Sequence, residues 1–391
     1  MTKHFPFGGF LSRTAPILRW ILLVFSIAPA FSLLAQPNAS PSAPSVPAPP
    51  PPRSRVVIVE DPSLVFQFQI NETAAARAFN NALLALTQKS SIREAWLSLV
   101  SPSDVVGVKI STAGARYGAT RSVVMSVLEG LQAAGIPAGN IILWDRFDYN
   151  MISAGYPPGP RRGWQIRSVV PGAGFDSAKF YFNEVVGQLI WSDLDFKGRK
   201  QVTLQNLIEQ ATPKTGNFTD PDAPKGPIQI SNRSYFTRIV TQQTTKIVNI
   251  AAMTDQAEIG INGCLASLAL ASVDNSRRFA DEKTSGDPAI AEILAHDVFA
   301  GKVVLNVMDG LIAQYAGGPT FTPHYANQAG LLFLSKDPVA IDTIALERIE
   351  QWRKDKKVVA IGESGKHVAG CAAYGLGTNK KSNMDILMVR P

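Results

Sequence analysis

The order of three consecutive segments constrains the fold of this chain most. Residues 105–110 form an apolar run typical of a buried strand, residues 121–134 show helical periodicity, and residues 141–144 form a second apolar run. Thr120 is a residue type that caps helices, and a Gly-Ile-Pro sequence at residues 135–137 ends the helical pattern. Two strands joined through a helix pair in parallel, so this order predicts a βαβ unit in an at least partly parallel sheet.

Further segments extend the same α/β pattern along the chain. Strand-like apolar runs also occur at residues 56–59, 303–308 and 331–334, and helices are expected at residues 72–86, from Gly263 onward and from Asp337 to Trp352. The sequence therefore predicts a single α/β domain over residues 55–391, with a mixed, largely parallel sheet flanked by helices. Helical periodicity fades at about residues 155–235, where we expect an irregular inserted segment.

The first 54 residues differ in composition from the rest of the chain. Residues 1–35 carry three basic residues, no acidic residue and an apolar run from Trp20 to Ala35. This pattern predicts either a cleaved signal peptide or an uncleaved N-terminal anchor, because the run is shorter than the roughly 20 residues of a membrane span. Residues 36–54, rich in Pro, Ala and Ser, are expected to form an extended linker. We therefore expect export to the periplasm or beyond, with the N-terminal segment contacting the membrane or the export machinery.

Charge and cysteine content exclude several classes of function. The formal net charge of +7 falls to +4 without the basic residues of the leader, and no basic stripe alternates with aromatic residues, so we expect no nucleic-acid partner. Cys264 and Cys371 are too few for an iron–sulfur cluster or a zinc site held by four thiolates. We interpret them as buried free thiols or, in an oxidising compartment, as a disulfide.

Four acidic residues lie just after strand-like runs, among them a run at residues 239–252. These residues are Asp145, Asp255, Asp309 and Asp337, and Lys109 lies near another strand end. Ligands of open parallel sheets bind outside the carboxyl ends of the strands, so these side chains are candidates for one polar site. Clustered carboxylates there would hold a hard divalent cation or act as acid and base. In the alternative interpretation, each aspartate caps a turn or the following helix.

A small-residue helical pattern that begins at Gly263 runs into a polar turn with two adjacent arginines, Arg277 and Arg278. Guanidinium groups hold anions through planar, charge-assisted hydrogen bonds. A Gly-rich loop at residues 113–118 precedes a helix, where anions are favoured, but it lacks the residues of a P-loop or of a dinucleotide-binding loop. The sequence also has no Gly-x-Ser-x-Gly motif, so it does not indicate a serine hydrolase.

From about Val105 onward the chain resembles the domain-of-unknown-function family 362. Similar segments occur in the family's order at residues 106–110, 140–147, 273–279, 288–292, 308–311, 317–319 and 337–342. The resemblance implies an α/β domain, often exported and sometimes joined to ferredoxin-like modules, whose activity is not established.

The chain departs from this family where polar groups would be expected. Residues 254–256 are Thr-Asp-Gln instead of Lys-Asp-His, residues 266–267 are Ala-Ser instead of Lys-Asn, and residues 120–121 are Thr-Arg instead of Thr-His. These exchanges remove cationic and acid–base groups together. They slightly favour a function in binding over one in catalysis.

Two functional hypotheses follow. The first is a binding protein with a polar pocket at the strand ends, which holds an anionic ligand or a divalent metal without turnover. Lys109, Arg146, Arg277 and Arg278 are the candidates for binding the anionic ligand. The alternative is an exported metal-assisted enzyme, with Asp145, Asp255 and Asp309 as catalytic candidates and these three plus Asp342 as ligands of a divalent metal. Both hypotheses predict that the carboxylates lie in one cleft near Arg146 or the Arg277–Arg278 pair, with Asp342 beside them.

Overall fold

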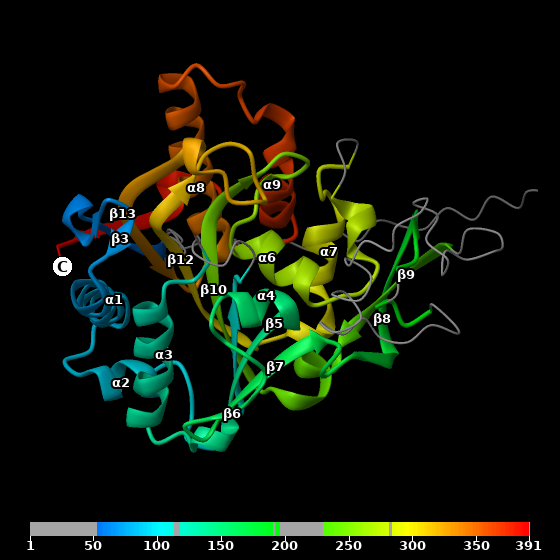
Figure 1. Ribbon diagram of the computed structural model, residues 1–391, viewed down its shortest axis with the longest axis horizontal. Coiled ribbons are helices and arrows are strands. Elements are labelled where there is room, and N and C mark those ends of the chain that lie inside the picture. Colours follow the sequence, from blue (N-terminus) through cyan, green and yellow to red (C-terminus); the bar gives the residue numbers. More distant parts are fainter. Residues whose placement is uncertain (1–52, 113–117, 191, 196–229, 281–283, 391) are drawn as a thin grey trace, which may run out of the picture. The chain divides into compact units, whose positions relative to one another are not determined.

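The parallel strands predicted from the apolar runs form the centre of one large sheet. In the computed structural model, five parallel strands are neighbours in the order β12-β10-β4-β5-β7 (Figure 1). Their bounds are β4 (Val106–Ile110), β5 (Ile141–Phe147), β7 (Trp164–Val170), β10 (Lys246–Gln256) and β12 (Val303–Gln314). The predicted βαβ unit is confirmed, because β4 and β5 pair in parallel and α3 (Arg121–Ala133) connects them.

The structure describes residues 53–112, 118–190, 192–195, 230–280 and 284–390. The expected leader, most of the expected linker and most of the Gly-rich loop at residues 113–118 lie outside these ranges. Among the described residues, no helix combines the length and the apolar character that a membrane span requires.

Antiparallel strands make the sheet mixed, as predicted. Next to β12 lies β13 (Ala326–Ser335), antiparallel to it, followed by β1 (Ser54–Glu60) and by β14 (Met384–Val389) at one edge. At the other edge β6 (Gly159–Arg161) is antiparallel to β7. A short strand, β11 (Gly260–Ile261), pairs with the end of β10.

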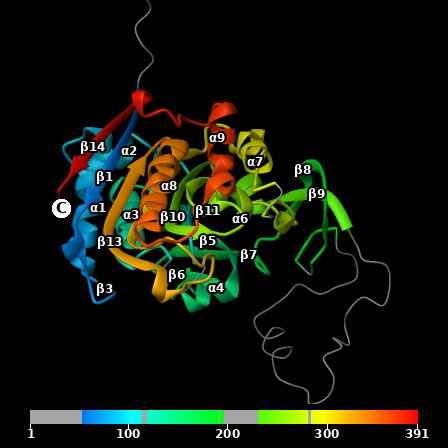
Figure 2. The same cartoon turned by 90° about the horizontal axis from the view of Figure 1, so that it is seen from above.

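Helices cover both faces of this sheet (Figure 2). One face packs against α1 (Glu72–Thr87), α2 (Ile92–Leu97) and α3. The other face packs against α6 (Cys264–Ala271), α7 (Ala289–Ala295), α8 (Pro338–Asp355) and α9 (Lys366–Ala373). Successive strand residues point to opposite faces, so β5, β7, β10 and β12 contribute apolar side chains to two separate cores. The apolar side chains of β4 belong only to the core beneath α1, α2 and α3.

Two of the predicted helix starts have different outcomes. Asp337 caps α8 as expected, because its carboxylate accepts the N–H of Ala340 at 2.9 Å and Pro338 occupies the first turn. Thr120 does not cap α3 through its side chain. Instead the backbone N–H of Thr120 donates to the Asp309 carboxylate at 2.6 Å, so a residue distant in sequence holds the start of this helix.

The expected inserted segment is partly regular. Its first residues form β6 and β7 of the main sheet. Burial alternates along the first part of β7, but the aromatic and Gly-rich composition of the segment obscured this pattern. After them, β8 (Phe175–Gln188) and β9 (Ile230–Thr237) form a separate antiparallel pair (Figure 1). Smaller elements complete the described fold: β2 (Val65–Phe66), β3 (Gln69–Ile70) and α4 (Asp148–Ser153).

Candidate functional site

A row of three polar side chains crosses the centre of the sheet beneath α6. Lys109, Asn249 and Asn306 are paired in register on the adjacent strands β4, β10 and β12. Lys109 Nζ donates to Ser267 Oγ of α6, and Asn249 Nδ2 donates to the carbonyl oxygen of Cys264 at 2.9 Å. All three are at most 2% exposed. Because buried polar groups require partners, this row fixes where α6 lies on the sheet.

Lys109 also pairs with Asp145, at the ends of the neighbouring strands β4 and β5. Lys109 Nζ lies 3.8 Å from Asp145 Oδ1. Asp145 Oδ2 accepts the backbone N–H of Thr112 at 3.0 Å and its hydroxyl at 2.5 Å, which holds the carboxylate in place. Burial lowers the pKa of Lys109, and the Asp145 carboxylate opposes this shift. The pair is therefore a buried charge couple at the edge where ligands of parallel sheets bind.

Arg146 extends the polar region along the end of β5. Its Nη1 donates to the carbonyl oxygen of Leu270, at the end of α6, at 2.7 Å and also to Ser276 Oγ. Burial lowers the pKa of Arg146, and the carboxylates of Asp193 and Asp274 raise it. The Arg146 Nε atom is buried and has no hydrogen-bond partner among the described residues. Arg146 is thus oriented by α6 and the following turn, and its buried Nε–H remains unpaired among the described residues.

The two adjacent arginines have different environments. Arg278 is buried, and its guanidinium donates to the carbonyl oxygens of Asn183, at 3.1 Å, and Val185 and to Ser234 Oγ, at 3.0 Å. Burial lowers the pKa of Arg278 to about 10. Arg277 is exposed and makes no hydrogen bond or ion pair with another described residue. The two arginines therefore do not bind one anion together as expected, because the Arg278 side chain connects β8 to β9 and Arg277 is the one of the two that faces solvent.

Asp193 and Asp274 are acidic neighbours of Arg146 that the sequence analysis did not select. Asp274 accepts the backbone N–H groups of Tyr235 at 2.5 Å and Leu194 at 2.7 Å, and burial raises its pKa to about 7. Asp193 accepts the N–H of Asn275 at 2.8 Å, and burial raises its pKa as well. Asp274 lies in the segment at residues 273–279 that resembles family 362, and this resemblance could have identified Asp274 as a candidate site residue.

Asp309 and Asp342 lie on opposite faces of the sheet. Asp309 accepts the N–H of Thr120 at the start of α3, whereas Asp342 accepts the N–H groups of Cys264 at 2.7 Å and Leu265 at 2.9 Å at the start of α6. Both side chains are buried, and burial raises both pKa values, that of Asp342 to about 7. Each carboxylate therefore compensates the unpaired N–H groups at one helix start.

Asp255 holds a loop at the end of β10. Its Oδ1 accepts the N–H of Gly318 at 3.0 Å and the Gln314 amide at 3.2 Å, and its Oδ2 lies 3.7 Å from the Arg353 guanidinium. A Cβ at Gly318 would lie 1.9 Å from the Asp255 carbonyl oxygen, so this close approach requires glycine. Burial raises the pKa of Asp255.

The predicted cluster of Asp145, Asp255, Asp309 and Asp342 is therefore wrong. In the described part of the chain, no three His, Cys, Asp or Glu side chains are arranged to hold a metal ion. The carboxylates accept hydrogen bonds from separate backbone segments, which is the capping role that the sequence offered as the alternative. Of the four, only Asp145 lies beside the basic residues Lys109 and Arg146.

The two cysteines are free and buried in separate helices, α6 and α9. Burial raises the pKa of both thiols. Both are therefore protonated at neutral pH.

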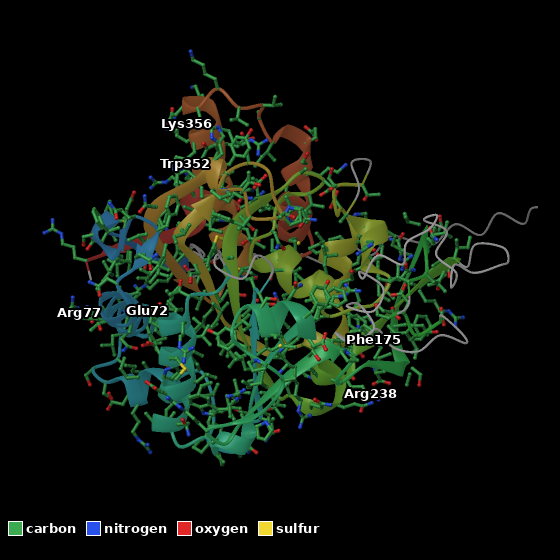
Figure 3. The ribbon with its side chains drawn as sticks, in the orientation of Figure 1. Glu72, Arg77, Phe175, Arg238, Trp352 and Lys356 are labelled. Atoms are coloured by element: carbon green, nitrogen blue, oxygen red, sulfur yellow. The ribbon has the colours of Figure 1, made fainter. Side chains whose placement is uncertain are left out.

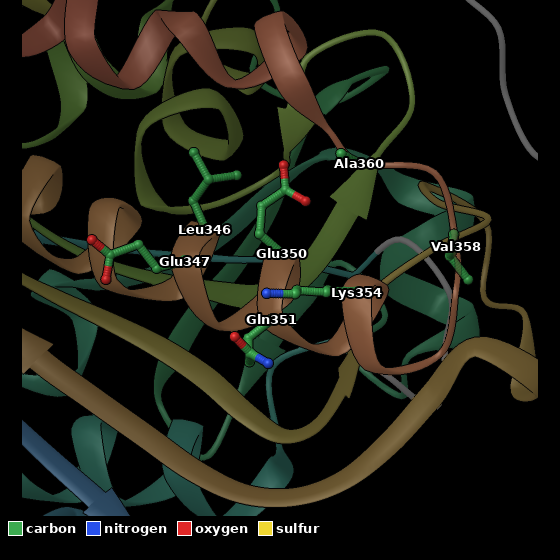
Figure 4. Close-up of a pocket in the computed structure, with 7 residues that line it drawn as sticks. All are labelled: Leu346, Glu347, Glu350, Gln351, Lys354, Val358 and Ala360. Atoms are coloured by element: carbon green, nitrogen blue, oxygen red, sulfur yellow. The ribbon is translucent and has the colours of Figure 1, made fainter.

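A surface groove of about 620 Å³ runs along α8. It is lined by Leu346, Glu347, Glu350, Gln351, Lys354, Val358 and Ala360 (Figure 4). The Glu350 carboxylate accepts the N–H groups of Ile361 at 2.8 Å and Gly362 at 3.1 Å. None of the candidate site residues lines the groove, so the groove is not the predicted ligand-binding site despite its volume.

Comparison with known proteins identifies the family-like part of the chain. Residues 202–347 match the family described as "Domain of unknown function (DUF362)", so the chain contains a DUF362 domain over these residues. No curated protein matches the chain. Among solved structures, a Thermotoga maritima protein matches with 8% sequence identity and a TM-score of 0.37 over 74% of this chain. The match spans 60% of the length of that Thermotoga protein.

Proposed function

We propose that this protein binds a small anionic ligand at the carboxyl ends of β4 and β5, without turnover. The observation that carries the proposal is the exposed guanidinium of Arg277, which forms no hydrogen bond or ion pair with another described residue and lies near the partly buried Arg146. Two like charges held close together repel each other, and a bound anion removes that repulsion. Arg277 would supply the charge-assisted hydrogen bonds to the ligand.

The described acidic residues near Arg146 form no hydrogen bond or ion pair with Arg277. Burial raises the pKa of Asp193, and the charges of Arg146 and Arg277 oppose this shift. Asp193 and Asp274 accept hydrogen bonds from backbone N–H groups, and the pKa of Asp274 is raised to about 7, so it is only partly charged at neutral pH. Asp145 is already engaged by Thr112 and Lys109. A positive charge therefore remains at this edge of the sheet.

Tyr149 adds a hydroxyl group to the proposed site. It follows β5 in α4 and is half-buried. Burial raises the pKa of its hydroxyl, and the positive charges of Arg277 and Arg146 oppose this shift. Its ring stacks on that of Phe147 with centroids 5.3 Å apart, and the Arg146 guanidinium lies 5.1 Å from the Phe147 ring centroid. This arrangement suits a ligand with a planar anionic group, such as a carboxylate, next to an aromatic wall.

The described acids give no comparable support to a metal-assisted enzyme. The DUF362 domain covers α6 and Arg277 but not β4 and β5, and its family has no assigned activity. The proposal therefore depends on the geometry around Arg146 and Arg277 and not on the family.

Binding is tested by titrating purified protein with citrate, phosphate and sulfate at constant ionic strength, using calorimetry and the unfolding temperature. Arg277→Gln is compared with Arg77→Gln, an identical change at an exposed arginine of α1 on the other face of the sheet (Figure 3). We expect Arg277→Gln to weaken anion binding by about 1.5–3 kcal/mol and Arg77→Gln to leave it unchanged. Equal affinities in the wild type and both variants would refute the proposal.

We also propose that the protein acts outside the cytoplasm. The basic, acid-free start, the apolar run and the Pro-rich linker support this location. Cell fractionation of the full-length chain tests it, and recovery of all the native protein from the cytoplasm would contradict it.

A further inference from the structure

A small cavity lies at the opposite, amino-terminal edge of the parallel strands. Its volume is about 160 Å³, and it is lined by residues of α6, α7, the segment before β12 and the segment after β13. The apolar part of the wall includes Leu268, Leu294, Phe299 and Val303. β12 begins at Val303, whereas Arg146 and Arg277 lie near the carboxyl end of β5, so the cavity is separate from the proposed anion site.

The size of the cavity limits what it can hold. An apolar cavity of about 150 Å³ in another protein accommodates one benzene molecule. The cavity in this protein, at about 160 Å³, therefore has room for one six-membered ring or an aliphatic chain of similar volume. Cys264 also lines it, and burial raises the pKa of its thiol, so the thiol is neutral and adds no charge to the wall.

Polar groups occur at two positions of the lining. Asn306 is fully buried, and the bond that its Nδ2 makes to a described residue is a long one of 3.4 Å, to the carbonyl oxygen of Lys336. Lys336 is exposed and lines the cavity, and its ammonium forms no hydrogen bond or ion pair with another described residue. The cavity thus combines an apolar interior with an unpaired cation at its exposed side.

We propose that this cavity is a second binding site, specific for a small monocarboxylate with an aromatic or short aliphatic body. The body fills the space between Leu268, Phe299 and Val303, where burial removes apolar surface from water. The carboxylate lies at the exposed side and pairs with Lys336. Neutral molecules of the same shape bind more weakly because they gain no attraction to the Lys336 ammonium.

Benzoate is the probe, with benzyl alcohol as its neutral counterpart and acetate as the carboxylate without a body. A ligand-observed NMR titration should show saturable binding of benzoate, weaker binding of benzyl alcohol and no saturable binding of acetate at this site. Lys336→Gln should weaken benzoate binding about two- to fivefold, as for an exposed ion pair, and leave benzyl alcohol unaffected. Lys356→Gln is the matched control, because Lys356 is an exposed lysine beyond the other end of α8 (Figure 3).

Filling the cavity gives an independent test. Leu294→Trp places a larger side chain in the wall and should abolish binding of both benzoate and benzyl alcohol; Val303→Phe serves the same purpose if the first variant does not fold. Arg277→Gln should leave benzoate binding in the cavity unchanged, which separates this site from the proposed anion site. Absence of saturable benzoate binding, or binding that survives a folded cavity-filling variant, would overturn the inference. Equal effects of Lys336→Gln and Lys356→Gln would overturn the role of the cation.

Discussion

Replacing Asp342 by alanine should destabilise the fold by removing both acceptors at the start of α6. The Asp342 carboxylate is fully buried and accepts the N–H groups of Cys264 at 2.7 Å and Leu265 at 2.9 Å. Leaving one buried donor without a partner costs about 1–3 kcal/mol, so two donors cost about 2–6 kcal/mol. Removing a carboxylate that burial disfavours offsets part of this cost. We therefore expect Asp342→Ala to lower the free energy of unfolding by about 2–4 kcal/mol, a large part of the stability of a typical domain.

Urea denaturation of the wild type and of two variants measures this effect. The control is Glu347→Ala on the same helix, because Glu347 forms an exposed ion pair with Lys381 whose loss should cost less than about 1 kcal/mol. If Asp342→Ala costs no more than Glu347→Ala, the carboxylate does not hold the start of α6 and the reasoning fails.

The pH dependence of the same comparison gives a second measurement. Burial raises the pKa of Asp342 from 3.8 to about 7, so the native state retains a proton that the unfolded state releases between these values. The contribution of Asp342 to stability is therefore fully present below about pH 4 and decreases as the pH rises toward about 7. We expect the stability difference between the wild type and Asp342→Ala to be larger at about pH 5 than at about pH 8. If the stability difference between the wild type and Asp342→Ala instead grows with pH, the pKa of Asp342 is lowered and not raised in the native state.

Two further predictions concern α9 and the loop at the end of β10. Burial lowers the pKa of His367 from 6.5 to about 4, so the unfolded state binds a proton at a higher pH than the native state does. The free energy of unfolding should therefore fall as the pH drops from about 6.5 to about 4. In denaturation measurements over this pH range, His367→Leu should reduce the fall, whereas His324→Gln, at an exposed histidine, should not. Gly318→Ala should destabilise the fold by about 1–3 kcal/mol, because its Cβ would lie 1.9 Å from the Asp255 carbonyl oxygen. Gly139→Ala, with no atom within 4 Å of its Cβ, is the control, and an equal effect in calorimetry would argue against the clash.

The order of the elements was predictable because it depends on local patterns. Apolar runs of strand length, a helix between two of them and the Asp337-Pro338 start each describe a short segment, and the structure contains all of them. The sequence pattern of a strand was weaker for β7, because the residues around it are rich in aromatic residues and glycine. The sequence analysis therefore did not identify β7 as a strand of the main sheet. A composition that differs from the rest of the domain does not exclude a segment from the sheet.

The roles of the charged residues depended on contacts between distant segments. Asp309 and Asp342 both resemble strand-end or helix-start acids in sequence, yet one bonds to α3 and the other to α6, on opposite faces of the sheet. Sequence spacing does not reveal which backbone N–H groups lack a partner within hydrogen-bond distance. The prediction of a shared metal site failed because that information arises only when the helices pack.

For Arg277 and Arg278, too, the sequence determined one part of the result and the tertiary structure determined the other. The sequence by itself determined that two adjacent arginines follow α6 in a polar turn. Only the tertiary structure placed the carbonyl oxygens of Asn183 and Val185 against Arg278 and left Arg277 exposed. A guanidinium must have partners once it is buried, so the packing of β8 and β9 decided which of the two arginines remains available to a ligand.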